Sequence, residues 1–311
     1  MATRVRLKNY FYLILLVFFI WMTGCGGQKM LRPKSVAHND LKKKILVLPL
    51  LNFTGLPEAK AEQIRTQLME ALQKDTRVIV QKNAAAPAAN FQPPKFLLPE
   101  FGLWSDPELL KNAEEYDLNI LLLPVLNPFK IHEIRAGIWP LFKSKQELDL
   151  SMTLNAFDPV HRLVYLIHLE NRKITLPKFD QGFGFGDPIN NEQKWKSIPD
   201  QTWEKNWSHI IARQVAVFLK ETAKRPWTGQ IITVESETLA INAGLDIGLR
   251  DGLVCEVFKR VESQGPQGWK VLSEGPKVGE IRITKTMDRT ALALPLNKAE
   301  IKPGQLIRVK N

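Results

Sequence analysis

The five histidines of the chain are the first residues to consider for chemistry, because imidazole binds metal ions and transfers protons. They stand at positions 38, 132, 161, 168 and 209. None lies four residues from another, as a zinc-binding helix requires, and none has a cysteine beside it. His161 and His168 flank a strand at odd spacing, so we expect their side chains on opposite faces. The sequence therefore predicts neither a metal site nor a cofactor.

Two other arrangements of residues could belong to an active site. The stretch Gly182-Phe183-Gly184-Phe185-Gly186 has the composition of a phosphate-binding loop, but no Lys-Ser/Thr pair follows it and no buried strand leads into it. Ser208 and His209 are neighbours, and a catalytic triad needs geometry rather than adjacency. We therefore expect Phe183 and Phe185 to be exposed contacts for a partner and predict that the protein is not an enzyme. A hydrolase with a site built from residues 82–105 and 176–200 stays open as an alternative.

The two cysteines are too few for a disulfide framework. Cys255 alternates with Val257 in a predicted strand, which indicates a buried free thiol. Cys25 follows Met22-Thr23-Gly24, and this sequence resembles the lipobox of bacterial lipoproteins. The resemblance implies that the Cys25 thiol takes a diacylglyceryl group by thioether formation, becomes the mature N-terminus and is further acylated, typically with palmitate.

Residues 1–24 match a lipoprotein signal peptide. Arg4, Arg6 and Lys8 precede thirteen apolar residues, Tyr10 to Met22, whereas a membrane-spanning helix needs about 20. Gly26, rather than an aspartate, follows the cysteine. By resemblance to the enterobacterial sorting rule, this implies a protein anchored in the outer membrane by lipid and facing the periplasm, with the inner membrane as the second choice. An uncleaved anchor helix with a chance cysteine is the alternative.

The net charge of +11 is unevenly distributed along the chain. Cleavage before Cys25 removes three positive charges and leaves +8, of which residues 227–311 carry +2 (12 basic against 10 acidic residues) and residues 25–226 carry +6. Part of this charge follows the predicted anchor closely, at Lys29, Arg32, Lys34, Lys42, Lys43 and Lys44. Near an anionic membrane each basic residue adds about 1 kcal/mol of attraction. A solvated basic linker is the alternative, and the predicted location argues against nucleic acid as a partner.

An apolar fraction of 44% and a charged fraction of 24% are typical of a globular protein, and 311 residues leave room for about two domains. Residues 25–42 are expected to form a tether. The next segment, 43–225, shows alternating strand and helix patterns that predict an α/β sandwich with a mixed sheet. The expected strands are 45–51, 77–80, 119–125, 146–156 and 163–173, and the expected helices are 57–74, 106–116 and 201–223.

Residues 226–311 have a different pattern, with short strands separated by glycine-containing turns. The expected strands are 229–234, 238–241, 254–259, 278–284, 290–294 and 305–309. This spacing predicts a small closed or half-closed β-barrel, with positive φ at Gly248 and Gly252. The predicted fold class is therefore α+β: an α/β sandwich with a mixed sheet, followed by a small all-β barrel-like domain.

Two segments resemble known families. Lys44-Ile45-Leu46-Val47-Leu48-Pro49 through Thr54 resembles the opening strand of the superfamily that contains the N-terminal domain of TolB and the lipoprotein CsgG. Residues 240–252 and 278–281 resemble the C-terminal domain of the flagellar ring protein FlgT. Both motifs are structural and carry over no catalytic residue. The resemblance implies a scaffold, assembly factor or binding module of the cell envelope.

The leading functional prediction is a non-catalytic envelope lipoprotein that acts as an assembly or scaffold factor through contacts with envelope proteins or with copies of itself. The second is a binding module for an anionic envelope polymer, peptidoglycan or lipopolysaccharide. The apolar stretch 136–142, which contains Trp139 and Phe142, is shorter than the roughly 9–11 residues of a membrane-spanning strand. It predicts an exposed contact patch rather than a pore.

Overall fold

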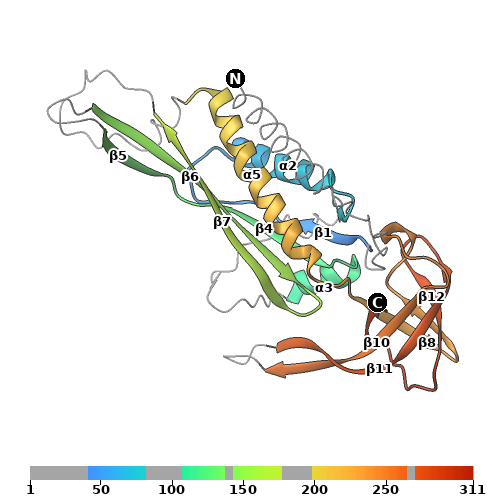
Figure 1. Cartoon of the computed structure of the whole chain (residues 1–311). Coiled ribbons are helices and arrows are strands. Elements are labelled where there is room, and N and C mark those ends of the chain that lie inside the picture. The colour runs from blue at the N-terminus through green and yellow to red at the C-terminus, as the bar shows by residue number, and fades with distance from the viewer. Residues whose placement is uncertain (1–40, 82–106, 137–142, 177–197, 265–269, 311) are drawn as a thin grey trace, which may run out of the picture. The chain divides into compact units, whose positions relative to one another are not determined.

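The computed structural model describes residues 41–81, 107–136, 143–176, 198–264 and 270–310. Residues 38–311 form one compact unit that contains a seven-stranded sheet and a closed barrel (Figure 1). The predicted fold class, α+β with a mixed sheet followed by a small barrel, is confirmed. The predicted signal peptide and almost all of the predicted tether lie outside the described residues.

The sheet has the strand order β3-β1-β4-β6-β5, with β2 paired to β4 and β7 paired to β6. Its strands are β1 (Lys43–Val47), β2 (Leu51–Asn52), β3 (Val78–Val80), β4 (Ile120–Leu126), β5 (Lys130–Ala136), β6 (Lys143–Asp158) and β7 (Leu163–Thr175). Strand β1 runs parallel to β3 and β4, whereas β6 runs antiparallel to β4, β5 and β7. The sheet is mixed because the first half is joined by helical crossovers and the second half by hairpins.

Two details of the predicted strands were wrong. The single strand expected at 45–51 is divided into β1 and β2 around Pro49, which has no amide hydrogen to donate to a ladder. Strand β5 was not expected at all, because its sequence Lys-Ile-His-Glu-Ile-Arg-Ala is too polar to stand out as a buried strand.

Helices cover both faces of the sheet. Helices α2 (Glu58–Gln73) and α5 (Asp200–Ala223) lie on one face, side by side in Figure 1, and α3 (Pro107–Glu115) lies on the other. On α2, the residues Ile64, Leu68 and Leu72 stand at four-residue spacing and are buried against the sheet. On α5, the buried face includes Trp203, Gln214 and Phe218. No helix among the described residues has the length and hydropathy needed to cross a membrane.

The barrel closes in the order β10-β11-β12-β9-β8-β13. Its strands are β8 (Gly229–Glu235), β9 (Thr238–Ile241), β10 (Val254–Gln264), β11 (Lys270–Thr286), β12 (Ala291–Pro295) and β13 (Leu306–Val309). Cys255 is buried in its core as predicted, and burial raises the pKa of its thiol to about 12. The predicted positive φ is confirmed at Gly248 and Gly252. Gly244 is needed for another reason: a Cβ there would lie 2.4 Å from the carbonyl oxygens of Met287 and Asp288.

Strands β10 and β11 extend beyond the barrel. Their mutual pairing continues to Gln264 and Lys270, whereas β13 pairs with β10 only as far as Phe258. Residues 260–264 and 270–274 therefore form a two-stranded projection, named the arm below and visible in Figure 1.

Candidate functional site

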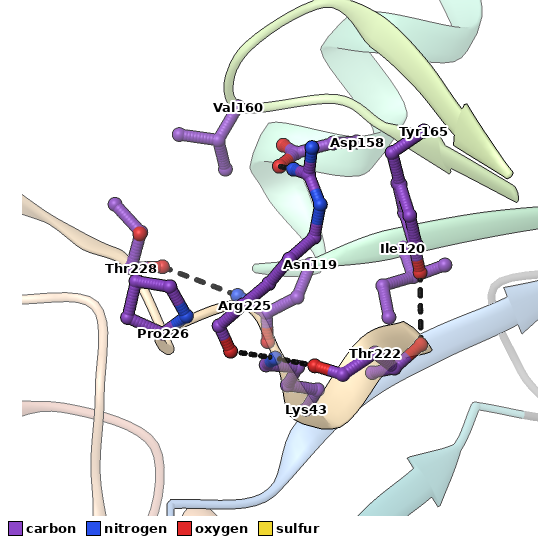
Figure 2. A pocket seen from close by; sticks show the side chains of 10 residues that line it. All are labelled: Lys43, Asn119, Ile120, Asp158, Val160, Tyr165, Thr222, Arg225, Pro226 and Thr228. Carbon is purple, nitrogen blue, oxygen red and sulfur yellow. Dashed lines mark hydrogen bonds and ion pairs between the residues drawn. The ribbon is translucent and has the colours of Figure 1, made fainter. Parts of the chain in front are cut away.

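A small pocket opens where β1, the β6–β7 turn and the C-terminal end of α5 meet the first residues after the helix (Figure 2). It is lined by Lys43, Asn119, Ile120, Asp158, Val160, Tyr165, Thr222, Arg225, Pro226 and Thr228. The space in it that water can occupy is about 20 Å³, which is room for one water molecule. Ligand pockets usually measure about 300–1,000 Å³. The pocket is therefore too small for a substrate, and its charged residues must be explained by the contacts they make with one another.

Lys43, the first residue of β1, binds the end of α5. Its Nζ donates hydrogen bonds to the carbonyl oxygens of Thr222 (2.6 Å) and Arg225 (2.5 Å). The last carbonyls of a helix have no partner within the helix and carry partial negative charge, so a cation there is stabilising. Burial lowers the pKa of Lys43 to about 8, although the nearby Asp158 carboxylate favours the charged form. Lys43 is thus a buried cap of α5 provided by the sheet.

Arg225 connects the same helix end to the β6–β7 hairpin. Its Nη1 lies 3.3 Å from Oδ2 of Asp158, and its guanidinium carbon lies 4.4 Å from the ring centroid of Tyr165. The Tyr165 hydroxyl is in turn 3.0 Å from Oγ1 of Thr222, and burial raises the pKa of this phenol. The Arg225 guanidinium is therefore in contact with the Asp158 carboxylate and the face of the Tyr165 ring, both of the same chain.

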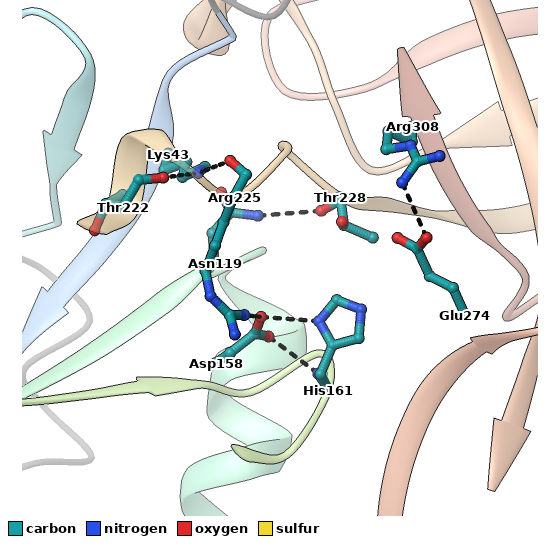
Figure 3. A network of polar contacts seen from close by, with 9 residues as sticks. All are labelled: Lys43, Asn119, Asp158, His161, Thr222, Arg225, Thr228, Glu274 and Arg308. Atoms are coloured by element: carbon teal, nitrogen blue, oxygen red, sulfur yellow. Dashed lines mark hydrogen bonds and ion pairs between the residues drawn. The ribbon is translucent and has the colours of Figure 1, made fainter. Parts of the chain in front are cut away.

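His161 and Asp158 form a pair within the β6–β7 turn. The backbone amide of His161 and its Nδ1 donate to the Asp158 carboxylate at 3.0 and 2.8 Å. Burial by itself lowers the pKa of His161, but the hydrogen bond and charge of Asp158, together with Glu274, outweigh it and raise the pKa above its usual value. An aspartate–histidine pair is part of a nucleophile-activating arrangement. The two hydrogen bonds between His161 and Asp158 order the β6–β7 turn (Figure 3).

The arm of the barrel holds this turn from the other side (Figure 3). The backbone amide of Leu272 donates to the carbonyl oxygen of His161 at 3.2 Å, and the Leu272 side chain is buried. At the base of the arm, Glu274 accepts a hydrogen bond of 3.1 Å from Arg308 of β13. The turn is therefore fixed between the helix end and the barrel.

Lys44 makes a second connection between sheet and barrel. Its Nζ lies 2.8 Å from Oδ2 of Asp246 and 3.7 Å from Oδ2 of Asp117, and its side chain is 2% exposed. Arg289 of the barrel lies 3.5 Å from the same oxygen of Asp117. Burial raises the pKa of Asp117, and the cations Lys44 and Arg289 oppose this effect. Two acidic groups and two basic groups from both parts of the fold thus share one partly buried cluster.

Asn119 lies between these two sets of contacts. Its Oδ1 accepts a hydrogen bond from the backbone amide of Lys44, and its Nδ2 donates to the carbonyl oxygen of Thr228. We call the whole set the junction, comprising Lys43, Lys44, Asp117, Asn119, Asp158, His161, Thr222, Arg225, Thr228, Asp246, Glu274, Arg289 and Arg308. The junction connects β1, β4, the β6–β7 turn, α5 and the barrel.

The junction corrects one expectation from the sequence. The sequence predicts that Lys43 and Lys44 belong to a basic cluster near the membrane, but both side chains are buried and paired within the protein. The physical reason is that β1 begins at Lys43, and the strand is covered on both faces from its first residue. No local signal in the sequence reveals this, because a lysine at the start of a strand has the same pattern whether it faces water or a helix end.

The predicted contact residues Phe183, Phe185, Trp139 and Phe142 lie outside the described residues, and so does Cys25. Three of the histidines bond to polar side chains: His132 to Asp149, His161 to Asp158 and His168 to Gln214. Within the described ranges, no three metal-binding side chains form a group that could hold an ion.

No protein-family model matches the chain, and no curated protein matches it. Among solved structures, the chain is similar to the hypothetical protein CT253 from Chlamydia trachomatis (12% identity, 56% of this chain and 96% of that chain, TM-score 0.29). It is also similar to the PelC dodecamer from Paraburkholderia phytofirmans (12%, 55% and 84%, 0.29) and to the lipoprotein GNA1162 from Neisseria meningitidis (10%, 59% and 99%, 0.29). TM-scores this low carry no argument about the function of this chain.

Proposed function

We propose that the protein is a non-catalytic lipoprotein of the cell envelope that acts as an assembly or scaffold factor through contacts with other proteins. The observation that carries the location is the sequence Met22-Thr23-Gly24-Cys25 behind a short apolar segment. In this proposal the lipid at Cys25 holds residues 38–311 on the periplasmic face of the outer membrane.

The junction supports a scaffold role rather than chemistry. Its cations bind carbonyl oxygens and carboxylates of the same chain, and its pocket has room for about one water molecule. These contacts join the sheet to the barrel, which is what a protein needs to present two surfaces in a fixed arrangement. Trp139, Phe142, Phe183 and Phe185 are the side chains that we propose as partner contacts.

The lipid anchor is tested on the full-length chain made in a Gram-negative host. Mass spectrometry of the purified protein should find an N-terminal peptide that begins at Cys25 and carries acyl chains, and metabolic palmitate labelling should depend on that residue. Cys25→Ser is the variant and Cys255→Ser is the matched control, because Cys255 is buried in the barrel. An unmodified Cys25 thiol, or a retained leader, would contradict the proposal.

The scaffold role is tested by cross-linking in intact envelopes followed by purification from detergent. We expect the parent protein to recover a defined envelope protein and Phe183→Ala/Phe185→Ala or Trp139→Ala/Phe142→Ala to reduce that yield at least about five-fold. Leu294→Ala, an exposed apolar residue of the barrel, is the control. Recovery of no partner by the parent protein would count against a scaffold.

The alternative, a binding module for peptidoglycan or lipopolysaccharide, relied on the +6 charge of residues 25–226. Two of those charges, Lys43 and Lys44, are used in the junction, which weakens the charge argument. A pull-down with either polymer distinguishes the two functions: binding that falls as salt rises would favour this alternative over the scaffold.

A further inference from the structure

Strand β7 has one edge without a partner strand among the described residues. It pairs with β6 over its whole length, from Leu163 to Thr175, and with no other described strand (Figure 1). No proline interrupts residues 166–175, and the one irregularity in the β6–β7 register lies before them, at Ala156/Phe157. Such an edge presents backbone donors and acceptors in the spacing that another strand needs.

The same strand exposes large apolar side chains. Ile167 is 46% exposed and Leu169 is 58% exposed, and both project on the same face because they are two residues apart. The register places them opposite Asn155 and Thr153 of β6, so the next strand outward would lie directly beside them. An uninterrupted edge that exposes Ile167 and Leu169 is the kind of surface that proteins usually block with a bulge, a proline, charged side chains or a covering element.

The charged residues of β7 indicate which strand could pair with its free edge. Glu170 is the one acidic residue of the strand, and Arg172 and Lys173 follow it. If two copies of β7 pair antiparallel about a two-fold axis at Asn171, Glu170 of each copy lies opposite Arg172 of the other. Arg172 is the one arginine within β7, so no other centre pairs Glu170 with an arginine of the strand itself. Opposite charges facing each other across two strands stabilise the pair.

The rest of the fold is compatible with this centre. Pairing about Asn171 uses residues 167–175, which are well separated from the turn that the arm contacts at His161. A centre at Ile167 would extend the pairing to the turn and place Arg172 opposite Arg162, so that like charges would face each other.

We propose that two copies of this chain associate through antiparallel pairing of their β7 edges, with the two-fold axis at Asn171. The two sheets then form one continuous sheet, and each Leu169 packs beside the aliphatic part of Lys173 from the other copy. A closed two-fold contact uses the β7 edges of both copies and leaves neither of them open for further addition. Anchoring on a membrane would raise the local concentration and favour such a small contact.

The test uses the full-length protein in detergent, with Asn171→Cys as the reporter for a short thiol-reactive cross-linker. We expect a cross-linked dimer from Asn171→Cys and none from the parent, whose Cys255 is buried and whose Cys25 thiol carries lipid in the proposed function. Adding Glu170→Arg should reduce the dimer yield at least ten-fold, and adding Arg172→Glu as well should restore it. Glu237→Arg, at an exposed barrel position, is the matched control and should have no effect.

Thermal unfolding verifies that each variant is folded. We expect all of the variants to fold, because the substituted positions are partly or fully exposed. The proposal is overturned if folded Asn171→Cys stays monomeric, if Glu170→Arg leaves the yield unchanged, or if the reporter captures a different protein. The dimer does not depend on the lipid, so an unlipidated but dimeric protein would contradict the proposed function alone.

Discussion

Lys43 illustrates how a single residue of this protein can stabilise one contact and oppose folding through its charge. Its ammonium satisfies two carbonyl oxygens at the end of α5, where an unpaired buried acceptor would cost about 1–3 kcal/mol. The same burial makes the charged form less favourable, which lowers the pKa of Lys43 to about 8. A hydrogen-bond donor at position 43 must be long enough to reach the end of α5 from strand β1, and the lysine side chain reaches both carbonyl oxygens.

Lys43→Met keeps the aliphatic length and removes the charge. The pKa of Lys43 falls from 10.5 to about 8 on folding, so the unfolded chain binds the proton more tightly between these pH values. The free energy of unfolding of the parent should therefore rise between about pH 8 and pH 10.5 relative to the variant, by on the order of 3 kcal/mol. Urea unfolding across that range measures the difference, and parallel pH profiles of the two proteins would contradict it.

Helix α5 is the element that connects strands β6 and β7 in the second half of the sheet. Gln214 is buried in the middle of its inner face, where the sequence pattern expects an apolar residue. Its Nε2 donates to the carbonyl oxygens of Met152 in β6 and His168 in β7, and its Oε1 lies 2.8 Å from Nδ1 of His168. One side chain therefore fixes the position of the helix over two strands.

Gln214→Leu fills the same volume without these hydrogen bonds. We expect the free energy of unfolding to fall by roughly 1–3 kcal/mol, because His168 Nδ1 loses its partner in a partly buried place. Thermal unfolding followed by circular dichroism provides the measurement. Arg213→Gln, on the exposed face one residue earlier, should change stability by less than about 0.5 kcal/mol. Equal losses for the two variants would show that Gln214 does not carry this role.

At the scale of the whole molecule, the junction joins sheet and barrel into one unit. Residues 38–311 are compact together, and Lys44, Asp117, Asp246 and Arg289 bring charges from both parts into one cluster. A buried cation with two carboxylate neighbours is stabilising only while the set is complete, because each group has lost much of its contact with water.

Lys44→Met and Asp246→Asn form a double-mutant cycle across the junction. Lys44→Met leaves the Asp246 carboxylate without its cation and should cost roughly 3–5 kcal/mol. The double variant should lose less than the sum of the single variants, with a coupling energy of about 1–3 kcal/mol. Lys302→Met removes an exposed partner of Glu300 at a similar distance and should cost at most about 1 kcal/mol. Additive losses across the cycle would mean that the two parts are not coupled here.

The sequence alone determined most of the elements and the fold class, but not strand β5 or the arm. Alternating strand and helix patterns predicted β4, α2 and α5, and short strands separated by glycine-containing turns predicted the barrel. These features follow from local periodicity, which one chain segment expresses by itself. The proposed location rests on the sequence alone as well, on Cys25 and the residues before it.

Only the tertiary structure decided what the polar residues do. Lys43 and Arg225 are 182 residues apart, and Lys44 and Asp246 meet across two parts of the fold. No periodicity encodes such pairs, since a lysine at the start of a strand has the same local pattern whether it faces water or a helix end. The free edge of β7 is equally a product of strand order: its sequence is that of a strand, and only the sheet shows that one side of it has no described neighbour.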